Sequence, residues 1–542
     1  KLNQSKFVLP NNLVKLDMKR VFLLLFSFYV AVIYGKDFNI LDFGAVSIEG
    51  KSNTIAIQNA IDSCILIGGG RVIIPAGTFI TGSVELKTNV ELFFEEGAQL
   101  MGSADLSDYP YHRASHKFVG DSVKLRSLIW ADNAENIKIC GYGIIDGQGA
   151  SESFSLHSDK KVIRPMVLRM INCRNIKIEN ITLKNSPMWM QQYVACRNLS
   201  ITGIQVHNHV NKHNDGLDIV GCSDVLISDC RISSDDDGIC LKTLSDAENN
   251  TIVVSNCIIA SNCNALKIGT ETRSANRNII FTGCVVKKSG VMSPPYKRDI
   301  GMCGVAIESV DGGIVENIVI SDISISGVYT PLFVRLGNRA RRYTDEQEPI
   351  AVGSIKNISF SNIIGTAERA PEIAISGIPG YDIENISFSN INLTMKGGLT
   401  EYDFSSKISE VEDHYPEVKM FGPYLPAYAL FIRHVNGIQM SGIRIQVENP
   451  DVRPAIMFDD VKNAVLQHIF VDADSASRSV LQIRNCSNFQ VYPFHLKQQV
   501  SVFLMLEGEF TNNIYLPNSH IIQSDILYKI QDGANEKALI IR

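Results

Sequence analysis

Hydrophobic and polar residues alternate in short runs along most of the chain, and one phrase built on this alternation recurs. An Asn or Asp is followed by Ile or Val at alternate positions, as in NIKIENITLKNS from Asn175. Similar phrases begin at Asn136, Asn198, Asp224, Asn250, Asn278, Asn317, Asn357 and Asn385, with weaker copies near Gly437, Asn463 and Asn488. Period-two alternation interrupted by Gly, Asn and Ser predicts short strands joined by turns.

The spacing of the copies indicates how these strands are arranged. Asn175, Asn198 and Asp224 are 23 and 26 residues apart, enough for two or three short strands. One such repeat cannot bury its own apolar side, whereas stacked repeats can, with parallel strands about 4.8 Å apart. We therefore predict an all-β protein, a right-handed single-stranded parallel β-helix. A leucine-rich horseshoe is the alternative, but it would require Leu at fixed positions, which the repeats do not have.

Segments between the repeats predict the ends and insertions of this solenoid. Residues 54–67 have apolar positions at helical spacing before Gly68-Gly69-Gly70, which predicts a short N-terminal capping helix. The charged, aromatic and Pro-containing stretch within residues 397–430 is expected to form a surface loop that walls a cleft. The predicted organisation is a leader at 1–35, a cap and first coils at 36–110, and a catalytic β-helix at 111–542 with an inserted loop at 397–430.

The cysteines follow the same register. Cys173, Cys196, Cys222 and Cys486 each lie two residues before a repeat, and Cys230, Cys257 and Cys284 recur every 27 residues. Equivalent positions on successive coils stack, so we expect most of the 12 cysteines to be buried thiols in ladders. Disulfides remain the alternative because the count is even.

The beginning of the chain predicts export. Met18-Lys19-Arg20 precedes an apolar run from Val21 to Ile33, with Gly35 at a suitable cleavage point, which is typical of a signal peptide at 18–35. A membrane anchor or buried helix is the alternative, but the run is short for a bilayer. We expect a periplasmic or secreted protein without a stable membrane partner.

Charge narrows the class of partner. The net charge of the 542 residues is −6, whereas a nucleic-acid-binding surface would be basic, so nucleic acid is not expected as a partner. An acidic polysaccharide would need only a few local cations in a cleft.

Three aspartates give the clearest chemical signal. Asp215 lies in HNDGLD, and Asp236 and Asp237 follow 21 and 22 residues later in SDDDG, about one coil away. This spacing predicts carboxylates on the same flank of adjacent coils, where repulsion favours one protonated acid beside ionised bases. Glycoside hydrolysis requires such a combination. A calcium site or solvated turn aspartates are the alternative.

Other polar and aromatic residues stand at coil spacing from these aspartates. Asn264 comes 27 residues after Asp237, and Lys267 follows shortly after. Lys242, Lys267 and Arg335 are candidates to meet a sugar carboxylate, although a solvated face would have similar residues. Trp189 precedes the site by about one coil and is a candidate either for stacking on a sugar ring or for core packing.

With these residues in view, the chain resembles the polygalacturonase family, glycoside hydrolase family 28, from about Phe38 to past residue 440. ILDFGAV, TIAIQNAID, GAQLMGS, GYGIIDGQG and NSPMW are family-like, NDGLD is similar to Asn-Thr-Asp-Gly, and DDDG to Gly-Asp-Asp. The resemblance implies a pectin-lyase-like β-helix that hydrolyses pectin with inversion and without a metal or cofactor. We also expect the protein to be a monomer. It makes Asp236 the general acid, with Asp215 and Asp237 activating water.

The chain departs from the family at two motifs. Gly-His-Gly falls on Cys263-Asn264-Ala265, and Arg-Ile-Lys falls on Ala306-Ile307-Glu308, which removes two cations that would hold galacturonate. This loss favours a neutral sugar at that subsite, so we expect cleavage of galacturonosyl–rhamnose bonds in rhamnogalacturonan. The residues expected to bind substrate are Asn264, Lys267, Lys242, Glu308, Arg335, Arg339, Trp189 and His213. A pectate-lyase-like enzyme and a non-catalytic carbohydrate-binding β-helix are the alternatives.

Overall fold

The computed structural model describes residues 36–118, 125–155, 164–342, 350–492, 494–517 and 523–541. The predicted leader at 1–35 lies outside these residues, so the signal peptide stays a prediction. Among the described helices, none has the length and apolar character needed to cross a membrane.

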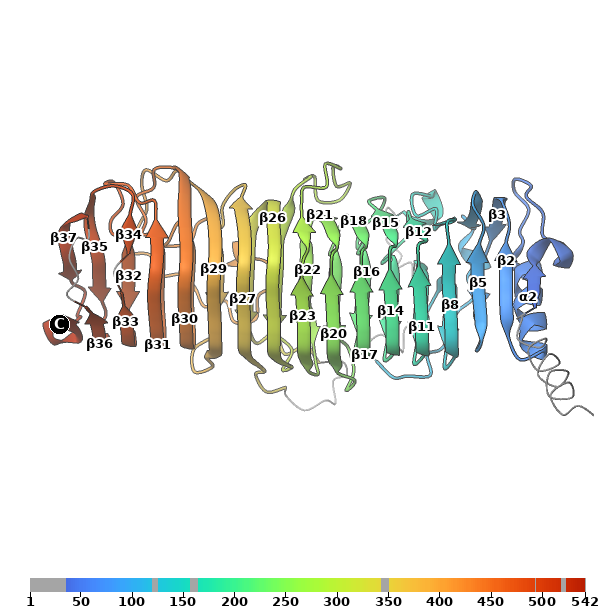
Figure 1. Cartoon of the computed structure of the whole chain (residues 1–542), viewed down its shortest axis with the longest axis horizontal. Helices are drawn as coiled ribbons and strands as arrows, with labels where there is room; N and C mark the ends of the chain where they lie inside the picture. The colour runs from blue at the N-terminus through green and yellow to red at the C-terminus, as the bar shows by residue number, and fades with distance from the viewer. Residues whose placement is uncertain are drawn as a thin grey trace, which may run out of the picture.

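The described chain forms one long solenoid of parallel strands, with successive coils stacked from the N-terminal to the C-terminal end (Figure 1). Each strand pairs with the strand one coil away, for example Ile176 of β11 (Arg174–Glu179) with Leu199 of β14 (Arg197–Thr202). The predicted parallel β-helix is confirmed. Pairing between coils is the reason why a repeat in sequence becomes a stack in space.

The strands form three rows along the solenoid. The first row holds β4 Val84–Glu85, β7 Ser127–Asp132, β10 Met166–Ile171, β13 Gln191–Val194, β16 Leu217–Val220, β19 Ile239–Thr243, β22 Asn264–Thr272, β25 Gly301–Ser309, β28 Ile373–Ser376, β32 Leu481–Arg484, β35 Val500–Glu507 and β37 Ser524–Ile530. The second holds β1 Asp37–Asn39, β2 Gly70–Ile74, β5 Val90–Phe94, β8 Glu135–Gly141, β11, β14, β17 Ser223–Ser228, β20 Asn249–Ser255, β23 Asn276–Thr282, β33 Ser487–Val491, β36 Asn512–Leu516 and β38 Leu539–Ile541.

The third row consists mostly of short strands. Several long strands bend from one row into the next. The third row holds β3 Gly77–Thr81, β6 Ala98–Gly102, β9 Ile144–Asp146, β12 Thr182–Lys184, β15 Gln205–Asn208, β18 Arg231–Ser234, β21 Ile258–Ser261, β24 Val285–Val286 and β34 His495–Leu496. The bent strands are β26 Ile314–Leu336, β27 Ser354–Ala367, β29 Ile383–Gly397, β30 Leu430–Asn449 and β31 Ile456–Val471.

The residue that opens each repeat has a defined structural role. Asn175, Asn198 and Asn317 have φ values of 54°, 55° and 59°, in the left-handed region that Asn tolerates better than most residues. Their side chains also bond from coil to coil: Asn198 Nδ2 donates to Asn175 Oδ1 at 2.8 Å. In the copy assigned to Asn250 the left-handed residue is Thr251 instead, so that repeat begins one residue later than predicted.

Inward positions fill a continuous core. In β11, Ile176 and Ile178 are buried and the flanking polar residues face outward, which is the alternation that the sequence contains. All 12 cysteines are buried free thiols, as expected for ladder residues rather than disulfides. Helix α2 (Thr54–Leu66) caps the N-terminal end and buries Ile57, Ile61 and Cys64, close to its predicted bounds.

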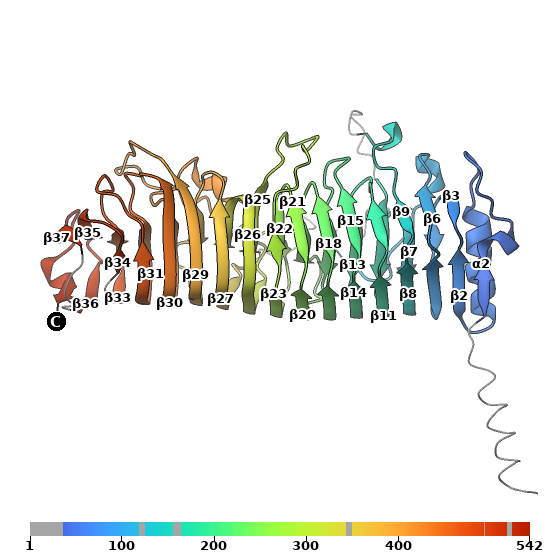
Figure 2. The same ribbon diagram turned by 45° about the horizontal axis from the view of Figure 1, so that its top comes forward.

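Loops rise from the edge of the solenoid at which the third row passes into the first (Figure 2). We name two of them. The tyrosine loop, residues 287–300, joins β24 to β25, and the long loop, residues 398–429, joins β29 to β30 and contains the 3₁₀ helix η4 (Val418–Phe421). Short 3₁₀ helices also occur at η1 Ile40–Phe43, η2 Leu106–Asp108, η3 Glu152–Phe154 and η5 Glu536–Ala538.

Candidate active site

Strand register brings the predicted aspartates together. Leu217 of β16 pairs with Ile239 of β19, so Asp215 and Asp237, each two residues earlier, lie side by side on adjacent coils. The backbone confirms this placement, because Gly216 N donates to the Asp237 carbonyl oxygen at 2.9 Å. The prediction that coil spacing would align these carboxylates is confirmed.

Side chains at equivalent positions form a line that continues on the coils before Asp215 and after Asp237. Met190 N donates to the Asp215 carbonyl oxygen at 3.0 Å, which places Trp189 next to Asp215 on the preceding coil. On the following coil, Asn264 contacts Asp237. Four successive coils therefore present one aromatic, two carboxyl and one amide side chain at equivalent positions.

Asp237 is surrounded by donors. Its Oδ2 lies 3.0 Å from Lys267 Nζ, and its Oδ1 accepts a hydrogen bond from Asn264 Nδ2 at 2.7 Å. Burial by itself would raise the pKa of Asp237, but the charges of Lys267 and Lys242 outweigh burial and hold the pKa below its usual range. Asp237 is therefore the carboxylate that this environment keeps ionised.

The pKa of Asp215 is shifted in the opposite direction. Burial raises the pKa of Asp215 well above its ordinary value, although the charge of Lys242 opposes the shift. Lys242 Nζ lies 3.0 Å from Asp215 Oδ2 and 2.7 Å from Asp218 Oδ1, so one ammonium is shared by two carboxyl groups. Burial likewise raises the pKa of Asp218 to about 6. The Lys242 ammonium also lies 3.9 Å from the centre of the Trp189 ring.

Asp236 lies one residue before this line and is the most accessible of the three predicted aspartates. Asp215 and Asp237 are 2% and 4% exposed, whereas Asp236 is only partly buried. Its Oδ2 accepts a hydrogen bond from the Tyr296 hydroxyl at 2.8 Å. Burial, together with the Asp236 charge, raises the pKa of Tyr296, so the phenol remains a proton donor. A carboxyl group placed in this way can reach a glycosidic oxygen.

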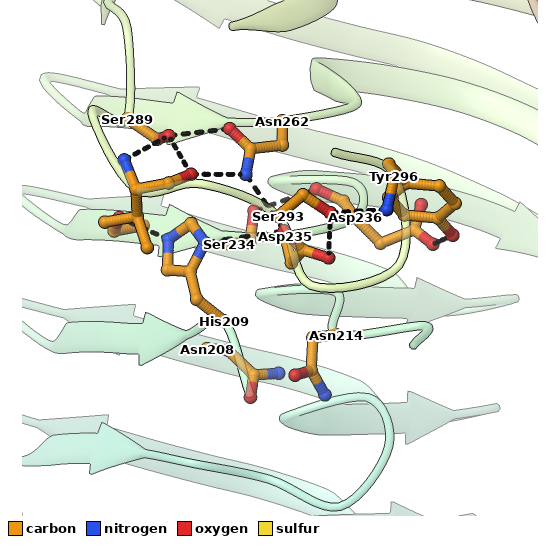
Figure 3. A network of polar contacts seen from close by, with 12 residues as sticks. Asn208, His209, Asn214, Ser234, Asp235, Asp236, Asn262, Ser289, Ser293 and Tyr296 are labelled. Carbon is orange, nitrogen blue, oxygen red and sulfur yellow. Dashed lines mark hydrogen bonds and ion pairs between the residues drawn. The ribbon is translucent and has the colours of Figure 1, made fainter. Parts of the chain in front are cut away.

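Figure 3 shows that the tyrosine loop is held by the first aspartate of the DDD triplet. Asp235 accepts hydrogen bonds from Ser293 Oγ and Asn262 Nδ2, both at 2.9 Å. The anchored loop then brings Tyr296 to Asp236. Sequence reasoning missed this tyrosine, since it stands in a loop outside the repeat, and a contact between residues 60 apart has no periodic signal.

His213, predicted to bind substrate, contacts a buried arginine. Arg164 Nη2 lies 3.3 Å from His213 Nδ1, and Arg164 Nη1 donates to the Lys212 carbonyl oxygen at 2.7 Å. Burial lowers the pKa of His213, with the Asp236 charge acting in the opposite direction. His213 therefore belongs to the surroundings of Asp236. Arg164 was not identified from the sequence.

The two arginines expected to bind substrate lie in a different environment. Arg335 is fully buried, and its guanidinium donates to the carbonyl oxygens of Glu410 and Val411 in the long loop. Arg339 Nε donates to Asp311 at 2.8 Å. These contacts anchor loops, so we do not include either arginine among the residues proposed to bind substrate.

Glu308 is also fully buried, and neither carboxyl oxygen has a hydrogen-bond partner among the described residues. Burial raises its pKa to about 7, although Lys267, whose Nζ lies 3.8 Å away, opposes the shift. With no exposed surface, Glu308 cannot contact a substrate, and it is paired with Lys267.

One group in the site has the spacing of metal ligands. Donor atoms of Asp236, Asp237 and Cys263 lie within 4.8 Å of one another. Both oxygens of Asp237 are already engaged by Lys267 and Asn264, which leaves a poor ligand set for a divalent cation. The expectation of a metal-free reaction is not tested by this geometry.

Fold and site together define a class of protein: a parallel β-helix that presents a line of carboxyl groups, with paired lysines, along one edge. Comparison with known proteins gives the family. The chain belongs to glycosyl hydrolases family 28, whose model matches residues 50–415. The family resemblance noted in the sequence is confirmed.

The individual relatives match parts of the chain. It is 34% identical over 218 residues to a probable polygalacturonase of Vitis vinifera, covering 38% of this chain and 44% of that protein. It is 35% identical over 158 residues to the exo-poly-alpha-D-galacturonosidase of Dickeya chrysanthemi, covering 28% and 26%. The matches thus span less than half the length of these curated relatives.

A solved structure supports the fold. The family 28 exopolygalacturonase of Yersinia enterocolitica aligns with a TM-score of 0.60 at 18% identity, covering 79% of this chain and 78% of that structure. At this level of identity the likeness bears on the fold alone.

Proposed function

We propose that this chain hydrolyses glycosidic bonds in galacturonate-containing pectic polysaccharide, with inversion at the anomeric carbon. The observation that carries the proposal is the register that sets Asp215 beside Asp237, with Asp236 next to both on the accessible edge. Hydrolysis with inversion requires one carboxylic acid and one carboxylate that activates water. The names of the relatives support a pectic substrate.

The environments of the three aspartates suggest their roles. Asp236, the most accessible, gives its proton to the leaving glycosidic oxygen. Asp237, kept ionised by Lys267, takes a proton from the attacking water, whose oxygen then bonds to the anomeric carbon. Asp215 orients that water, because its raised pKa keeps it protonated over a wider pH range than Asp237 and so less available to accept a proton. Asn264 and Lys267 act through Asp237.

Which glycosidic bond is cleaved is a separate question from the type of reaction. Ala306 stands where the family would have an arginine, so the lost clamp still favours a neutral sugar such as rhamnose beside the cleaved bond. The argument from Glu308 is weaker, because the side chain is buried and cannot repel a uronate by contact. We therefore propose galacturonosyl–rhamnose bonds as the preferred linkage on the loss of the clamp alone.

Product analysis tests the proposal. The protein is incubated with homogalacturonan and rhamnogalacturonan oligosaccharides, alongside Asp236→Asn, and the products are identified by chromatography and mass spectrometry. Saturated products with inverted anomers are expected, and Asp236→Asn should lower the rate by about 10²–10⁴-fold. Faster cleavage of homogalacturonan than of rhamnogalacturonan would refute the proposed linkage while leaving hydrolysis intact.

Two other outcomes would refute hydrolysis itself. An unsaturated product absorbing in the near ultraviolet would identify a lyase. Binding without turnover, unaffected by Asp236→Asn, would indicate a carbohydrate-binding β-helix. Asp224→Asn, on the exposed side of β17, is a suitable control, since it removes a carboxylate of the same solenoid far from the proposed chemistry.

A further inference from the structure

A hollow lies on the same edge of the solenoid as the carboxylates, outside the site described above. It has a volume of about 700 Å³. Its walls come from the turn after β27, from the end of β29 and from the long loop, and they include Arg369, Pro371, Lys396, Lys419 and Tyr424. We call it the distal groove.

Strand register gives the position of the distal groove relative to the aspartates. Along the first row, Ile239 pairs with Leu266, Leu266 with Val305, and Val305 with Leu332, which lies level with Ile373 of β28. Ala370 therefore has the same place in its coil as Asp236 has four strands earlier. Four strand spacings amount to about 19 Å, a length that an oligosaccharide can span but a single sugar cannot.

A strip of residues at equivalent positions lies between the two places. Cys263, Met302 and Tyr329 occupy the equivalent positions on the three intervening coils, and Met302 and Tyr329 line a small depression that also includes Lys419. Lys419 Nζ lies 4.4 Å from the centre of the Tyr329 ring. Lys419 lines the distal groove as well, so it joins this strip to the groove.

Charge distinguishes the distal groove from an ordinary crevice. Three cations, Arg369, Lys396 and Lys419, line it together with a single acidic residue, Glu368. Lys396 is paired with Glu448 at 2.5 Å, and Lys419 Nζ lies 3.9 Å from Glu417, while Arg369 and Lys419 are exposed to solvent. The groove thus has positive charge available for an anion.

The groove also has an aromatic surface. Tyr424 is 42% exposed and lines the wall formed by the long loop. A tyrosine ring offers an apolar face with a polar edge, which suits the alternating apolar and hydroxyl surfaces of a pyranose ring. Cations for a carboxylate and a ring for the sugar body are the two elements that a uronate requires.

We propose that the distal groove binds uronate units of the same acidic oligosaccharide whose bond is cleaved beside Asp236. This inference rests on the proposed function and extends it: the protein selects long acidic chains by a contact about four coils away from the chemistry. A neutral chain would gain little from Arg369 and Lys419.

Kinetics with substrates of two lengths test the proposal. Arg369→Gln/Lys419→Gln is compared with Arg231→Gln/Lys177→Gln, which removes two exposed cations from other parts of the solenoid. The ratio of KM for a long acidic oligosaccharide to KM for a short one is expected to rise about five- to tenfold in the groove variant only, since two exposed charge contacts are lost. The rise should shrink at high salt. An unchanged ratio, or an equal rise in the control variant, would overturn the proposal.

Binding measurements separate this inference from the proposed function. Long galacturonate oligomers are titrated into Asp236→Asn protein with and without the two groove substitutions, and Kd is measured by calorimetry. A Kd that weakens about five- to tenfold supports the distal groove even if the wild type hydrolyses nothing. If the wild type hydrolyses the substrate normally but the groove substitutions leave Kd unchanged, the proposed binding at the distal groove is refuted and the proposed function is not.

Discussion

Lys267 shows how a buried residue can control catalysis without touching the substrate. From the sequence it was expected to bind a sugar carboxylate, so that replacement would raise KM for uronates. In the structure it is 3% exposed and lies between Asp237 and Glu308. We now place it behind the proposed base as a positioning residue.

Lys267→Met should therefore lower kcat by about 10- to 100-fold, with a smaller effect on KM. Without the ammonium, buried Asp237 binds a proton more readily, so the acidic limb of the pH–rate profile should move to higher pH. Steady-state kinetics across pH measure both effects, with Lys177→Met, at an exposed position of β11, as the control. A rise in KM with kcat and the pH profile unchanged would restore Lys267 as a substrate ligand.

Glu308 gives a prediction for stability. Its pKa is raised from 4.5 to about 7 by burial, so the folded state binds a proton that the unfolded state releases. Its favourable contribution is complete below about pH 4.5 and is lost as pH rises through about 7. Relative to Glu308→Gln, the wild type should lose on the order of 2 kcal/mol between pH 4 and pH 8. Denaturant unfolding of both proteins measures this difference, and a pH-independent difference would contradict it.

At the scale of the element, the asparagine that opens a repeat performs two tasks, which substitution can separate. Asn317 has φ 59°, donates to Asn278 at 3.3 Å and accepts from Asn357 at 3.1 Å. Asn317→Ala should lower the free energy of unfolding by about 2 kcal/mol, since it loses both bonds and strains the backbone. Asn317→Gly loses the bonds without the strain and should cost about 1 kcal/mol.

Chemical denaturation of the two variants and the wild type provides the measurement. Asn392, on the third-row part of β29, can be changed to Ala as a control, because it lies outside the asparagine ladder. Equal losses for Asn317→Ala and Asn317→Gly would show that the left-handed backbone carries no cost at this position.

Over the whole molecule, the sequence predicted the positions of residues within the repeats, but it did not predict those in the segments that interrupt the repeats. Asp215, Asp236 and Asp237 were placed correctly because one coil of sequence translates into one strand spacing. Tyr296 and Arg164 were missed because they lie in segments between strands, where no register applies.

The direction of buried side chains in the first row also escaped prediction, for a different reason. Alternation distinguishes inside from outside only when one face of a strand meets water. Every residue of β25 is buried, and so is the end of β26, which the long loop covers. Glu308 and Arg335 lie on these strands, so nothing in the local pattern could show that they turn away from solvent.

The buried cysteines allow local opening of the solenoid to be measured at several places along its length. A thiol reacts as the thiolate and only when reagent reaches it, and burial raises the pKa of Cys196 well above its ordinary value. Coils at the ends of a solenoid have one neighbour fewer and fray first. Cys64 and Cys486, nearest the two ends, should therefore be alkylated before Cys196 and Cys222 in the interior. Mass spectrometry of partially alkylated protein would then map the order in which coils separate, without any introduced label.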